Sequence, residues 1–346
     1  MKASLLTEVG QVVYSDVPKP GIEQPDQVLV AIKAVGICGS DVHFWEWGKI
    51  GDFVVNFPLI MGHEAAGVVV EVGSEVTDLA PGDRVALEPG LPCRRCKLCR
   101  IGMYNLCQNM RFLSAPPYDG CFCEYVVWPQ DYCFKLPDNM TCEEGAMMEP
   151  LNVGLYGATR GPVQAGDTVL VTGGGPIGLM ALQSAKALGA GKLVVTDPVE
   201  ARRQFALQLG ATVALDPSAA DFEARLRAEV GKLGADVTLE CSGAVPALQQ
   251  ACYFTRPGGA LVSIGVFAQN EFELPIWHIQ SREIDFKGIF RYRNLYPAAI
   301  ALTASGQIDV KSMITARYPL EQLQEALGFS SREKGSAIKT VITVGE

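Results

Sequence analysis

The sequence predicts an α/β protein with two domains, one rich in β-strands and one built on a doubly wound parallel sheet. At 346 residues, the chain is longer than a single hydrophobic core usually serves. Short β-branched runs separated by Gly and Pro fill residues 28–128, a texture typical of an irregular antiparallel sheet or partial barrel. From Asp167 onward, apolar strands alternate with helical patterns, which predicts parallel pairing through right-handed crossovers.

The order of the elements sets the domain boundaries. The predicted strands of the first domain are VLVAIKAVGI, AAGVVVEVG, DRVAL and CEYVVW. In the second domain the strands DTVLVTG, KLVVTD, TVALD, ADVTLECSG and GGALVSIG alternate with the helical segments LMALQSAKALGA, EARRQFALQLGA, FEARLRAEV and VPALQQACYF. After residue 290 the pattern is irregular, with a helix near residues 320–329, so we infer that the chain returns to its first domain. We therefore expect residues 1–150 and 290–346 to form the β-rich domain and residues 151–289 to form the doubly wound domain.

Composition disfavours several classes of function. Hydrophobic residues make up 48% of the chain, but no apolar run approaches the roughly 20 residues that span a bilayer. Residues 1–10 have neither a basic start nor a cleavable apolar stretch. The formal charge of −9, without a basic block, disfavours nucleic acid and anionic membranes as partners. We therefore expect a cytoplasmic protein whose eleven cysteines are reduced.

Four cysteines have the spacing of a metal knuckle, C-x2-C-x2-C-x7-C. They are Cys93, Cys96, Cys99 and Cys107. Two-residue gaps allow tight turns that gather thiolates around tetrahedral Zn²⁺, and such a site stabilises a segment with little apolar core of its own. Free thiols or disulfides are the alternative, but the other seven cysteines show no framework pattern. The sequence therefore predicts a structural zinc site.

A glycine-rich turn follows the first strand of the second domain. The segment GGGPIG gives G-x-G-x-x-G on Gly173, Gly175 and Gly178 and opens a helix at Pro176 and Ile177. The glycines allow a tight turn and a close approach to a pyrophosphate, while the helix N-terminus presents N–H groups to the anion. Because a strand precedes the turn and a helix follows it, the segment predicts a dinucleotide site. The alternative is a doubly wound domain that binds no dinucleotide.

An acidic residue ends the next strand. Asp197 stands 24 residues beyond Gly173, where a carboxylate accepts hydrogen bonds from the adenosine ribose and repels a 2′-phosphate. This position favours NAD over NADP. Arg202, five residues later, lies either beside the adenine or in solvent, and together with Arg203 it leaves some use of NADP open.

A dinucleotide domain supplies only the hydride carrier, so the first domain must hold the group that activates the substrate. The chain has three histidines, and His63 directly precedes Glu64 where a predicted strand meets a glycine-rich loop. Cys38 lies at a similar junction of strand and loop, and Glu149 lies at the junction of the two domains. One thiolate, one imidazole and one or two carboxylates make a zinc site with a position left for water or substrate. The spacing leaves plainer alternatives open: Cys38 as a core residue, Glu64 as a surface charge and Glu149 as a helix N-terminal carboxylate.

Segments spread along nearly the whole chain carry a family resemblance. They are GICGSDVH, GHEAAGVVVEVG, PGDRVALEPG, the four-cysteine segment, LPDN, MEPLNVG, GGGPIG and FRYRNLYP. In this order they resemble the zinc-dependent medium-chain polyol dehydrogenases, the sorbitol and xylitol dehydrogenases. The resemblance implies a GroES-like catalytic domain and a Rossmann domain that binds NAD. MEPLNVG and FRYRN are specific to the polyol branch, since the related alcohol dehydrogenases have a cysteine in the place of Glu149.

The resemblance implies roles for particular residues. Cys38, His63 and Glu64 would bind the catalytic zinc, and Glu149 would reach the metal directly or through a water. Arg291 and Tyr292 would contact the substrate. The residues that would line the cofactor are Gly173, Gly175, Pro176, Ile177, Gly178, Asp197, Arg202, Ile264, Gly265, Val266, Ile289, Phe290 and Arg291.

Two positions after Cys38 bear on substrate and proton handling. Phe44 stands where sorbitol dehydrogenases often have a tyrosine, so a hydroxyl near the substrate is absent and polyol selectivity would differ. Ser40 either relays the alcohol proton through water toward solvent or stabilises the turn.

The resemblance implies a concrete reaction. Zinc as a Lewis acid lowers the pKa of a coordinated hydroxyl, so an alkoxide forms and its carbon passes hydride to C4 of the nicotinamide. An alditol such as sorbitol or xylitol is thereby oxidised at C2 to a ketose, the reaction of L-iditol 2-dehydrogenase and D-xylulose reductase. The alternatives are another zinc-dependent alcohol or amino-alcohol dehydrogenase and a structural relative without catalysis. By analogy we expect a homodimer or homotetramer.

Overall fold

The structure divides the chain into two compact units. This computed structural model describes residues 1–333, 335 and 337–345. The first unit contains Met1–Glu149, Tyr296–Ala304 and Val310–Glu346, and the second contains Pro150–Leu295 and Ser305–Asp309. The chain thus returns to its first unit at Tyr296, six residues later than the residue 290 expected from the sequence.

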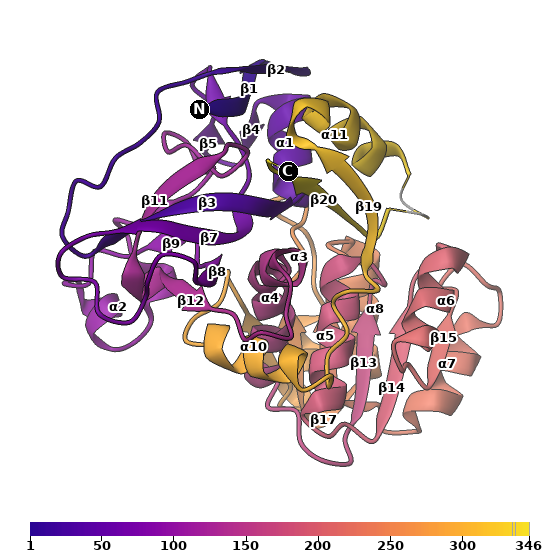
Figure 1. Cartoon of the computed structure of the whole chain (residues 1–346). Helices are drawn as coiled ribbons and strands as arrows, with labels where there is room; N and C mark the ends of the chain where they lie inside the picture. Colours follow the sequence, from indigo (N-terminus) through magenta and orange to yellow (C-terminus); the bar gives the residue numbers. More distant parts are fainter. Residues whose placement is uncertain (334, 336, 346) are drawn as a thin grey trace. The chain divides into compact units, whose positions relative to one another are not determined.

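A mostly antiparallel sheet forms the centre of the first unit. Its strands follow the order β12-β8-β7-β3-β20-β19, and β11 pairs with β3. Their bounds are β3 (Gln27–Gly36), β7 (Glu64–Val72), β8 (Arg84–Leu87), β11 (Tyr125–Pro129), β12 (Cys133–Lys135), β19 (Ile314–Pro319) and β20 (Lys339–Thr343). The C-terminal strand β20 lies between β3 and β19, so segments more than 300 residues apart in the sequence pair in one sheet (Figure 1).

Smaller elements complete the first unit. The additional strands are β1 (Lys2–Glu8), β2 (Gln11–Asp16), β4 (Lys49–Ile50), β5 (Phe53–Val54), β6 (Leu59–Ile60), β9 (Gly90–Leu91) and β10 (Arg111–Phe112). The helices are α1 (Gly39–Trp47), α2 (Lys97–Arg100), α3 (Cys142–Ala146), α10 (Tyr296–Ala304) and α11 (Leu323–Arg332), with the 3₁₀ turns η1 (Tyr104–Leu106), η2 (Gln130–Tyr132) and η3 (Leu320–Gln322). The inward residues of β3 pack with fully buried Leu6, Met61 and Phe122 in one hydrophobic core.

A six-stranded parallel sheet forms the second unit, which confirms the predicted doubly wound arrangement. The strand order is β15-β14-β13-β16-β17-β18. The strands are β13 (Thr168–Thr172), β14 (Lys192–Thr196), β15 (Val213–Leu215), β16 (Ala235–Glu240), β17 (Thr255–Ser263) and β18 (Asp285–Gly288). The helices are α4 (Met148–Arg160), α5 (Pro176–Ala187), α6 (Glu200–Gln208), α7 (Phe222–Val230), α8 (Val245–Phe254) and α9 (Ile276–Ser281). The order reverses at β13, which pairs with β14 on one side and β16 on the other, and such switch points bind ligands at the carboxyl ends of the strands.

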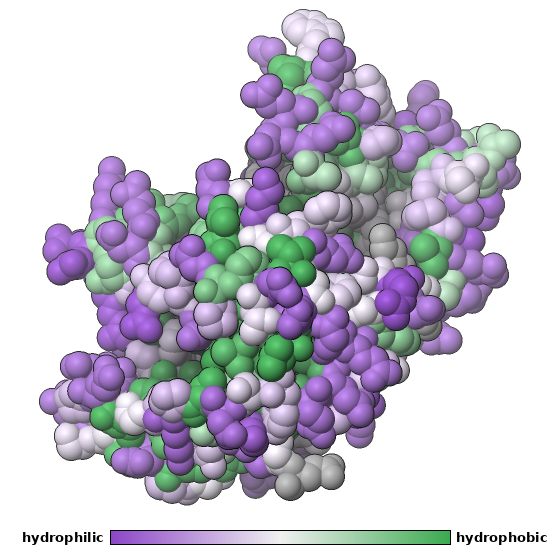
Figure 2. Space-filling model, turned by 90° about the horizontal axis from the view of Figure 1, so that it is seen from above, coloured by the Kyte–Doolittle hydropathy of each residue, from purple (hydrophilic) through white to green (hydrophobic). Residues whose placement is uncertain are grey.

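On the face shown in Figure 2, hydrophilic side chains cover most of the area and hydrophobic ones form smaller groups between them. Among the residues that the structure describes, no helix has the length and apolar character needed to cross a bilayer.

We expect Tyr296→Phe to destabilise the first unit. Tyr296 is 1% exposed, and its hydroxyl donates a hydrogen bond to the carbonyl oxygen of Leu87 at 2.7 Å. The variant removes this donor from a buried acceptor, at a cost of about 1–3 kcal/mol, so calorimetry should record a melting temperature lower by several degrees. The exposed Tyr14 provides the matched control, Tyr14→Phe. Equal melting temperatures of the two variants would contradict this expectation.

Candidate metal centres and dinucleotide site

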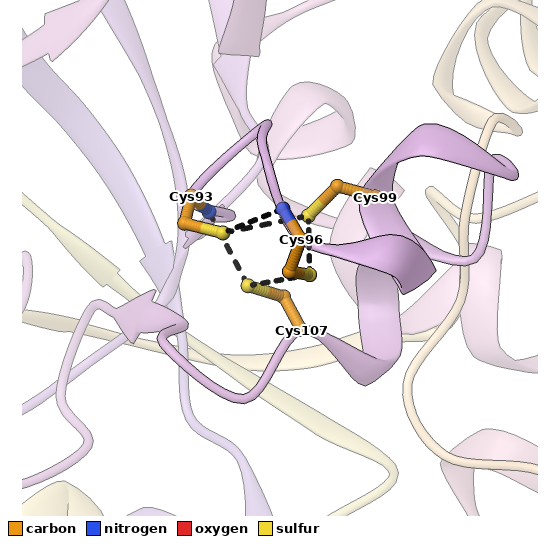
Figure 3. A group of neighbouring side chains, drawn as sticks. All are labelled: Cys93, Cys96, Cys99 and Cys107. Carbon is orange, nitrogen blue, oxygen red and sulfur yellow. Dashed lines mark hydrogen bonds between the residues drawn. The ribbon is translucent and has the colours of Figure 1, made fainter.

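The four predicted ligands of the cysteine segment lie together. Cys96 Sγ is 3.4 Å from Cys99 Sγ and 4.0 Å from Cys107 Sγ, and Cys93 Sγ is 4.0 Å from Cys99 Sγ (Figure 3). Zn–S bonds of about 2.3 Å place the sulfurs of a tetrahedral site about 3.8 Å apart. The four thiols therefore fit a structural zinc ion.

Backbone N–H groups donate hydrogen bonds to sulfurs of this cluster. Hydrogen bonds from the amides of Arg95 and Cys96 lower the pKa of Cys93 to about 6, which favours the thiolate that metals bind. The amide of Cys93 in turn donates to Cys107 Sγ at 3.3 Å. The short strands β9 and β10, which flank the segment, pair with each other. The chain thus enters and leaves the segment at one place.

Glu88 ties the cysteine segment to the main sheet. It follows β8, is 4% exposed, and accepts a hydrogen bond from the Tyr104 hydroxyl at 2.9 Å. Its carbonyl oxygen accepts a second hydrogen bond from Trp128 Nε1 at 2.8 Å. Burial raises the pKa of Glu88 to about 7; the bond from Tyr104 opposes this shift and the charge of Glu149 adds to it. A carboxyl that is partly neutral near pH 7 limits the negative charge around Glu149.

Strand pairing brings Cys38, His63 and Glu64 together. β3 and β7 are antiparallel, with Gly36 opposite Glu64. Since Cys38 follows Gly36 by two residues and His63 directly precedes Glu64, this register sets them side by side. The potential ligand atoms of the three residues all lie within 4.8 Å of one another. A Cβ on Gly36 would lie 2.0 Å from Glu64 Oε2, so the close approach requires glycine.

A buried carboxylate that the sequence analysis missed supports this cluster. Asp41, in the first turn of α1, is fully buried. Its Oδ2 accepts the amide of Cys38 at 2.9 Å, and its Oδ1 accepts the amide of Gly62 at 3.1 Å and lies 3.9 Å from His63 Nδ1. Carboxylates behind metal-binding histidines commonly orient the ring. The signal in the sequence is an aspartate three residues after Cys38 at the start of a helix, where it caps the first turn.

A buried lysine, also missed, compensates Glu64. Lys339 of β20 is 4% exposed, and its ammonium group pairs with both carboxylate oxygens of Glu64. It also donates to the carbonyl oxygen of Ile37 at 2.8 Å. Burial lowers the pKa of Lys339, but the negative charges of Glu64 and Cys38 raise it above its usual value. The two partners are 275 positions apart in the chain, so no local pattern predicts the pair.

The cluster attracts positive charge. Burial lowers the pKa of His63, but the negative charges of Cys38, Asp41 and Glu149 overcome this effect and raise it to about 10. Surroundings that favour a buried imidazolium also favour a cation held by the same atoms. A thiolate, an imidazole and a carboxylate form a zinc site with an open coordination position. The residues therefore fit a catalytic zinc ion.

Glu149 and Ser40 belong to the same unit. Glu149 is the second residue of α4 and is 6% exposed. Its charge contributes to the raised pKa values of His63 and Lys339. Ser40 lies in the first turn of α1, two residues after Cys38, and is partly exposed.

Two phenylalanines occupy different surroundings. Phe44 is 5% exposed and packs in the hydrophobic core of the first unit. Phe112, which the sequence analysis did not single out, packs against His63 with ring centroids 5.5 Å apart. The apolar contact beside the candidate metal ligands therefore comes from Phe112. Phe112 belongs to β10, which pairs with β9. No local sequence pattern therefore predicts that Phe112 lies beside His63.

The glycine-rich turn has the geometry of a phosphate-binding turn. Gly173, with a φ of +93°, follows β13, Gly175 caps α5 and Pro176 begins it. A Cβ on Gly178 would lie 1.7 Å from the carbonyl oxygen of Gly173, so the close packing of turn and helix requires glycine. Helix N-termini of this kind present N–H groups to anions.

Asp197 is joined directly to this turn. It lies at the carboxyl end of β14 and is 3% exposed. Its Oδ2 accepts the amide of Gly174 at 2.8 Å, and its Oδ1 accepts the amide of Val199 at 2.8 Å. Arg202 Nη1 lies 3.8 Å from Oδ2, whereas Arg203 binds the carbonyl oxygen of Asp197 at 2.8 Å. Arg202 is therefore the arginine beside the Asp197 carboxylate, whereas Arg203 binds the backbone at Asp197 and pairs with the Asp216 carboxylate at 3.2 Å.

The other predicted cofactor residues follow β17 and β18. They are Ile264, Gly265 and Val266 after β17, and Ile289, Phe290 and Arg291 after β18. Because the strands are parallel, these positions share the carboxyl edge of the sheet with Gly173 and Asp197. Arg291 has a φ of +54°, with Cζ 4.8 Å from the centroid of the Phe290 ring. Tyr292 is 3% exposed.

Comparisons with known proteins agree with this arrangement. Residues 24–138 match the family model of the alcohol dehydrogenase GroES-like domain, and residues 176–305 match that of zinc-binding dehydrogenases. A GroES-like unit with two candidate zinc sites, together with a doubly wound unit with a dinucleotide turn, defines a zinc-dependent medium-chain dehydrogenase.

Individual relatives show which members of this class the chain resembles. A probable D-xylulose reductase of Neosartorya fischeri is 44% identical over 343 residues, which cover 98% of this chain and 95% of the relative. Human sorbitol dehydrogenase is 45% identical over 328 residues, which cover 94% of this chain and 90% of the relative. An Escherichia coli oxidoreductase of unknown specificity, known from its crystal structure, is 38% identical to this chain in sequence. The two structures match with a TM-score of 0.95, over 100% of this chain and 99% of that one.

The chain belongs to the zinc-dependent medium-chain dehydrogenase family that includes sorbitol dehydrogenase and D-xylulose reductase. This confirms the family and the fold predicted from the sequence.

We expect Lys339→Met to make the stability of the protein depend on bound zinc. The substitution leaves Glu64 buried without its cation, and breaking a buried pair in this way costs about 3–5 kcal/mol. A zinc ion beside Glu64 would offset much of this cost. Calorimetry with chelator and with zinc should therefore show a larger loss of melting temperature, relative to wild type, in the metal-free protein.

The exposed pair of Lys2 and Asp16 gives the control. Lys2 Nζ lies 2.8 Å from Asp16 Oδ2, and the two side chains are 41% and 76% exposed. Exposed pairs contribute little to stability, so Lys2→Met should melt like wild type with or without zinc. A metal-free Lys339→Met protein as stable as metal-free wild type would disprove the compensating role of Lys339.

Proposed function

We propose that this chain is an NAD-dependent polyol dehydrogenase that oxidises alditols of the sorbitol and xylitol type at C2 to ketoses. The observation that carries the proposal is the cluster of partly exposed Cys38 with buried His63 and Glu64, in a chain that is 44% identical to a probable D-xylulose reductase and 45% identical to human sorbitol dehydrogenase. Glu149, in the place of the cysteine of related alcohol dehydrogenases, favours the polyol branch.

The two candidate metal sites have different tasks. The proposed ligands are Cys38, His63, Glu64 and, directly or through a water, Glu149 for the catalytic zinc, and Cys93, Cys96, Cys99 and Cys107 for the structural zinc. A bound catalytic zinc supplies Lewis acidity, which lowers the pKa of an alcohol hydroxyl in contact with it. Asp41 places a carboxylate 3.9 Å from His63 Nδ1, and Lys339 balances the charge of Glu64.

The reaction removes a proton and a hydride from the alcohol. A bound NAD would accept the hydride from C2 while the hydroxyl proton leaves to solvent, so that the products would be a ketose, NADH and a proton. Ser40 Oγ, partly exposed beside Cys38, is the proposed relay for the proton. Arg291 and Tyr292 are the proposed hydrogen-bond partners of the hydroxyls that do not react. Phe44 has no hydroxyl with which to bind the substrate.

The dinucleotide turn is proposed to bind NAD. The pyrophosphate would lie against Gly173, Gly175 and the N-terminus of α5. Asp197, held by the amides of Gly174 and Val199, offers a fixed carboxylate to the adenosine ribose and repels a 2′-phosphate. The carboxylate therefore sets the preference for NAD, although Arg202 is close by.

A panel of alcohols tests this function. The zinc-loaded wild type should oxidise sorbitol and xylitol with kcat/KM at least about tenfold above that for ethanol, because a site built to bind hydroxyls discriminates strongly against substrates that lack them. NAD should be the better cofactor when NAD and NADP are assayed separately. Faster oxidation of primary alcohols or amino alcohols would replace the polyol assignment with that of another zinc-dependent dehydrogenase.

We further propose a homodimer or homotetramer that works in the cytoplasm. Free thiols beside a cysteine-rich zinc site suit a reducing compartment. β18 ends the parallel sheet, and an edge strand offers unpaired backbone groups to a second copy. Near this edge Trp277 is 77% exposed and Phe286 is 42% exposed. Twofold pairing of the same edge would cover both side chains.

Trp277→Glu should weaken this assembly, because buried tryptophans often dominate interfaces. Light scattering after size-exclusion chromatography should show a dimer or tetramer for wild type and a smaller species for the variant. Trp47→Glu, at a tryptophan that is 65% exposed in the first unit, is the control and should keep the wild-type mass. A monomeric wild type, or a variant of unchanged mass, would rule out this interface.

A further inference from the structure

A buried carboxylate lies outside the residues assigned so far. Glu240 is the last residue of β16 and is fully buried. β16 lies between β13, which leads into the glycine-rich turn, and β17. Glu240 therefore stands at the carboxyl edge of the sheet, where doubly wound domains bind dinucleotides. A charged residue in such a place needs partners, because an unpaired buried carboxylate is costly.

One oxygen of Glu240 holds the turn that follows β16. Oε1 accepts the amide of Ser242 at 2.8 Å, the hydroxyl of Ser242 at 2.5 Å and the amide of Gly243 at 3.0 Å. The hydroxyl of Thr172, at the end of β13, lies 3.4 Å from the same oxygen. Hydrogen bonds from amides to a carboxylate are stronger than those between neutral groups. The conformation of this turn therefore depends on the carboxylate.

The backbone of Glu240 holds a second turn. Its carbonyl oxygen accepts the amide of Ile264 at 2.8 Å and that of Gly265 at 2.9 Å. These residues follow β17 and are among the predicted cofactor contacts. One residue thus binds the turns after two neighbouring strands, the first through its side chain and the second through its carbonyl group.

The two turns contact each other through glycine. A Cβ on Gly265 would lie 2.2 Å from the amide nitrogen of Gly243, and a Cβ on Gly243 would lie 2.2 Å from the carbonyl oxygen of Val266. A Cβ on Gly173, in the glycine-rich turn, would lie 2.9 Å from the Cα of Ser242. The backbones pack so closely that a shift of the turn after β16 must displace its neighbours.

The second oxygen of Glu240 has a different environment. Oε2 is buried and has no hydrogen-bond partner among the residues that the structure describes. It faces the turn after β17, since a Cβ on Gly265 would lie 2.9 Å from it. Buried polar atoms without a protein partner are usually satisfied by a ligand or an ordered water. This unsatisfied oxygen therefore points to a functional role beyond packing.

The strand order separates the two halves of a bound dinucleotide. In doubly wound domains the strands on one side of the switch point bind the adenosine half and those on the other side bind the second nucleotide. Asp197 ends β14, on the first side of β13, and Glu240 ends β16, on the other. The two carboxylates thus serve different halves of the ligand.

We propose that Glu240 is a positioning residue for the nicotinamide half of the cofactor, which it places by fixing the turns after β16 and β17. This inference rests on the proposed binding of NAD. It predicts that a change at Glu240 affects ligands that carry the nicotinamide and spares ligands that carry only the adenosine half.

Calorimetric titration of the full-length, zinc-loaded protein with NADH and with ADP tests the inference. Glu240→Ala should raise the Kd of NADH about tenfold and leave that of ADP within about twofold, because several charge-assisted hydrogen bonds to one half of the site are lost. Glu240→Gln keeps an acceptor at the position of Oε1 and should restore most of the affinity for NADH. A wild type that binds neither ligand would refute the proposed function itself.

A matched variant separates positioning from general destabilisation. Thr238 is fully buried in the same strand, and its hydroxyl hydrogen-bonds with that of Thr255 at 2.8 Å. Thr238→Val should lower the melting temperature without a selective loss of NADH. The inference is overturned if Glu240→Ala binds NADH like wild type, or if it loses NADH and ADP in parallel. Should Glu240→Ala fail to fold, Ser242→Ala must show the selective loss, and equal affinities there would overturn the inference as well.

Discussion

The burial of Glu64 beside Cys38 is the constraint on which the first unit depends. A buried carboxylate next to a thiolate is unfavourable unless cations compensate both charges. Lys339 supplies one such cation, and it reaches Glu64 because β20 lies between β3 and β19, with Val341 opposite Gly36. The last strand of the chain is thus part of the candidate metal site. The return of the chain to its first unit is therefore a requirement of the site as well as of the sheet.

Three buried carboxylates hold functional turns in the same way. Asp41, Asp197 and Glu240 are each at most 3% exposed, and each accepts two backbone amides at distances of 2.8–3.1 Å. Where a chain leaves a strand, its amides lose their partners in the sheet and need new ones. A carboxylate that accepts these amides satisfies them strongly and fixes the conformation of the turn.

The sequence predicted the features that depend on local pattern. The strands of the parallel sheet could be predicted because strands buried on both faces form continuous apolar runs, and the cysteine segment could be predicted because its spacing alone defines a metal knuckle. Lys339 could not be found in this way, since its partner Glu64 lies 275 positions away in the chain. Asp41 and Glu240 have local partners, but they also bind distant segments, at Gly62 and at Ile264, which no local pattern predicts. The edge strand β18 was missed because its short sequence, DFKG, has no apolar alternation and is recognised only by its pairing with β17.

The two candidate metal sites differ in what supports them, and this difference agrees with the tasks proposed for them. The helix α2 of the cysteine segment has no buried residue, so a metal held by four sulfurs would take the place of a core and leave no coordination position for a substrate. The cluster of Cys38, His63 and Glu64 is anchored in the main sheet, with Asp41 and Lys339 behind it. Its position is therefore fixed by the fold rather than by the metal. A metal bound there is free to use its open position for chemistry, because the protein does not need that position for stability.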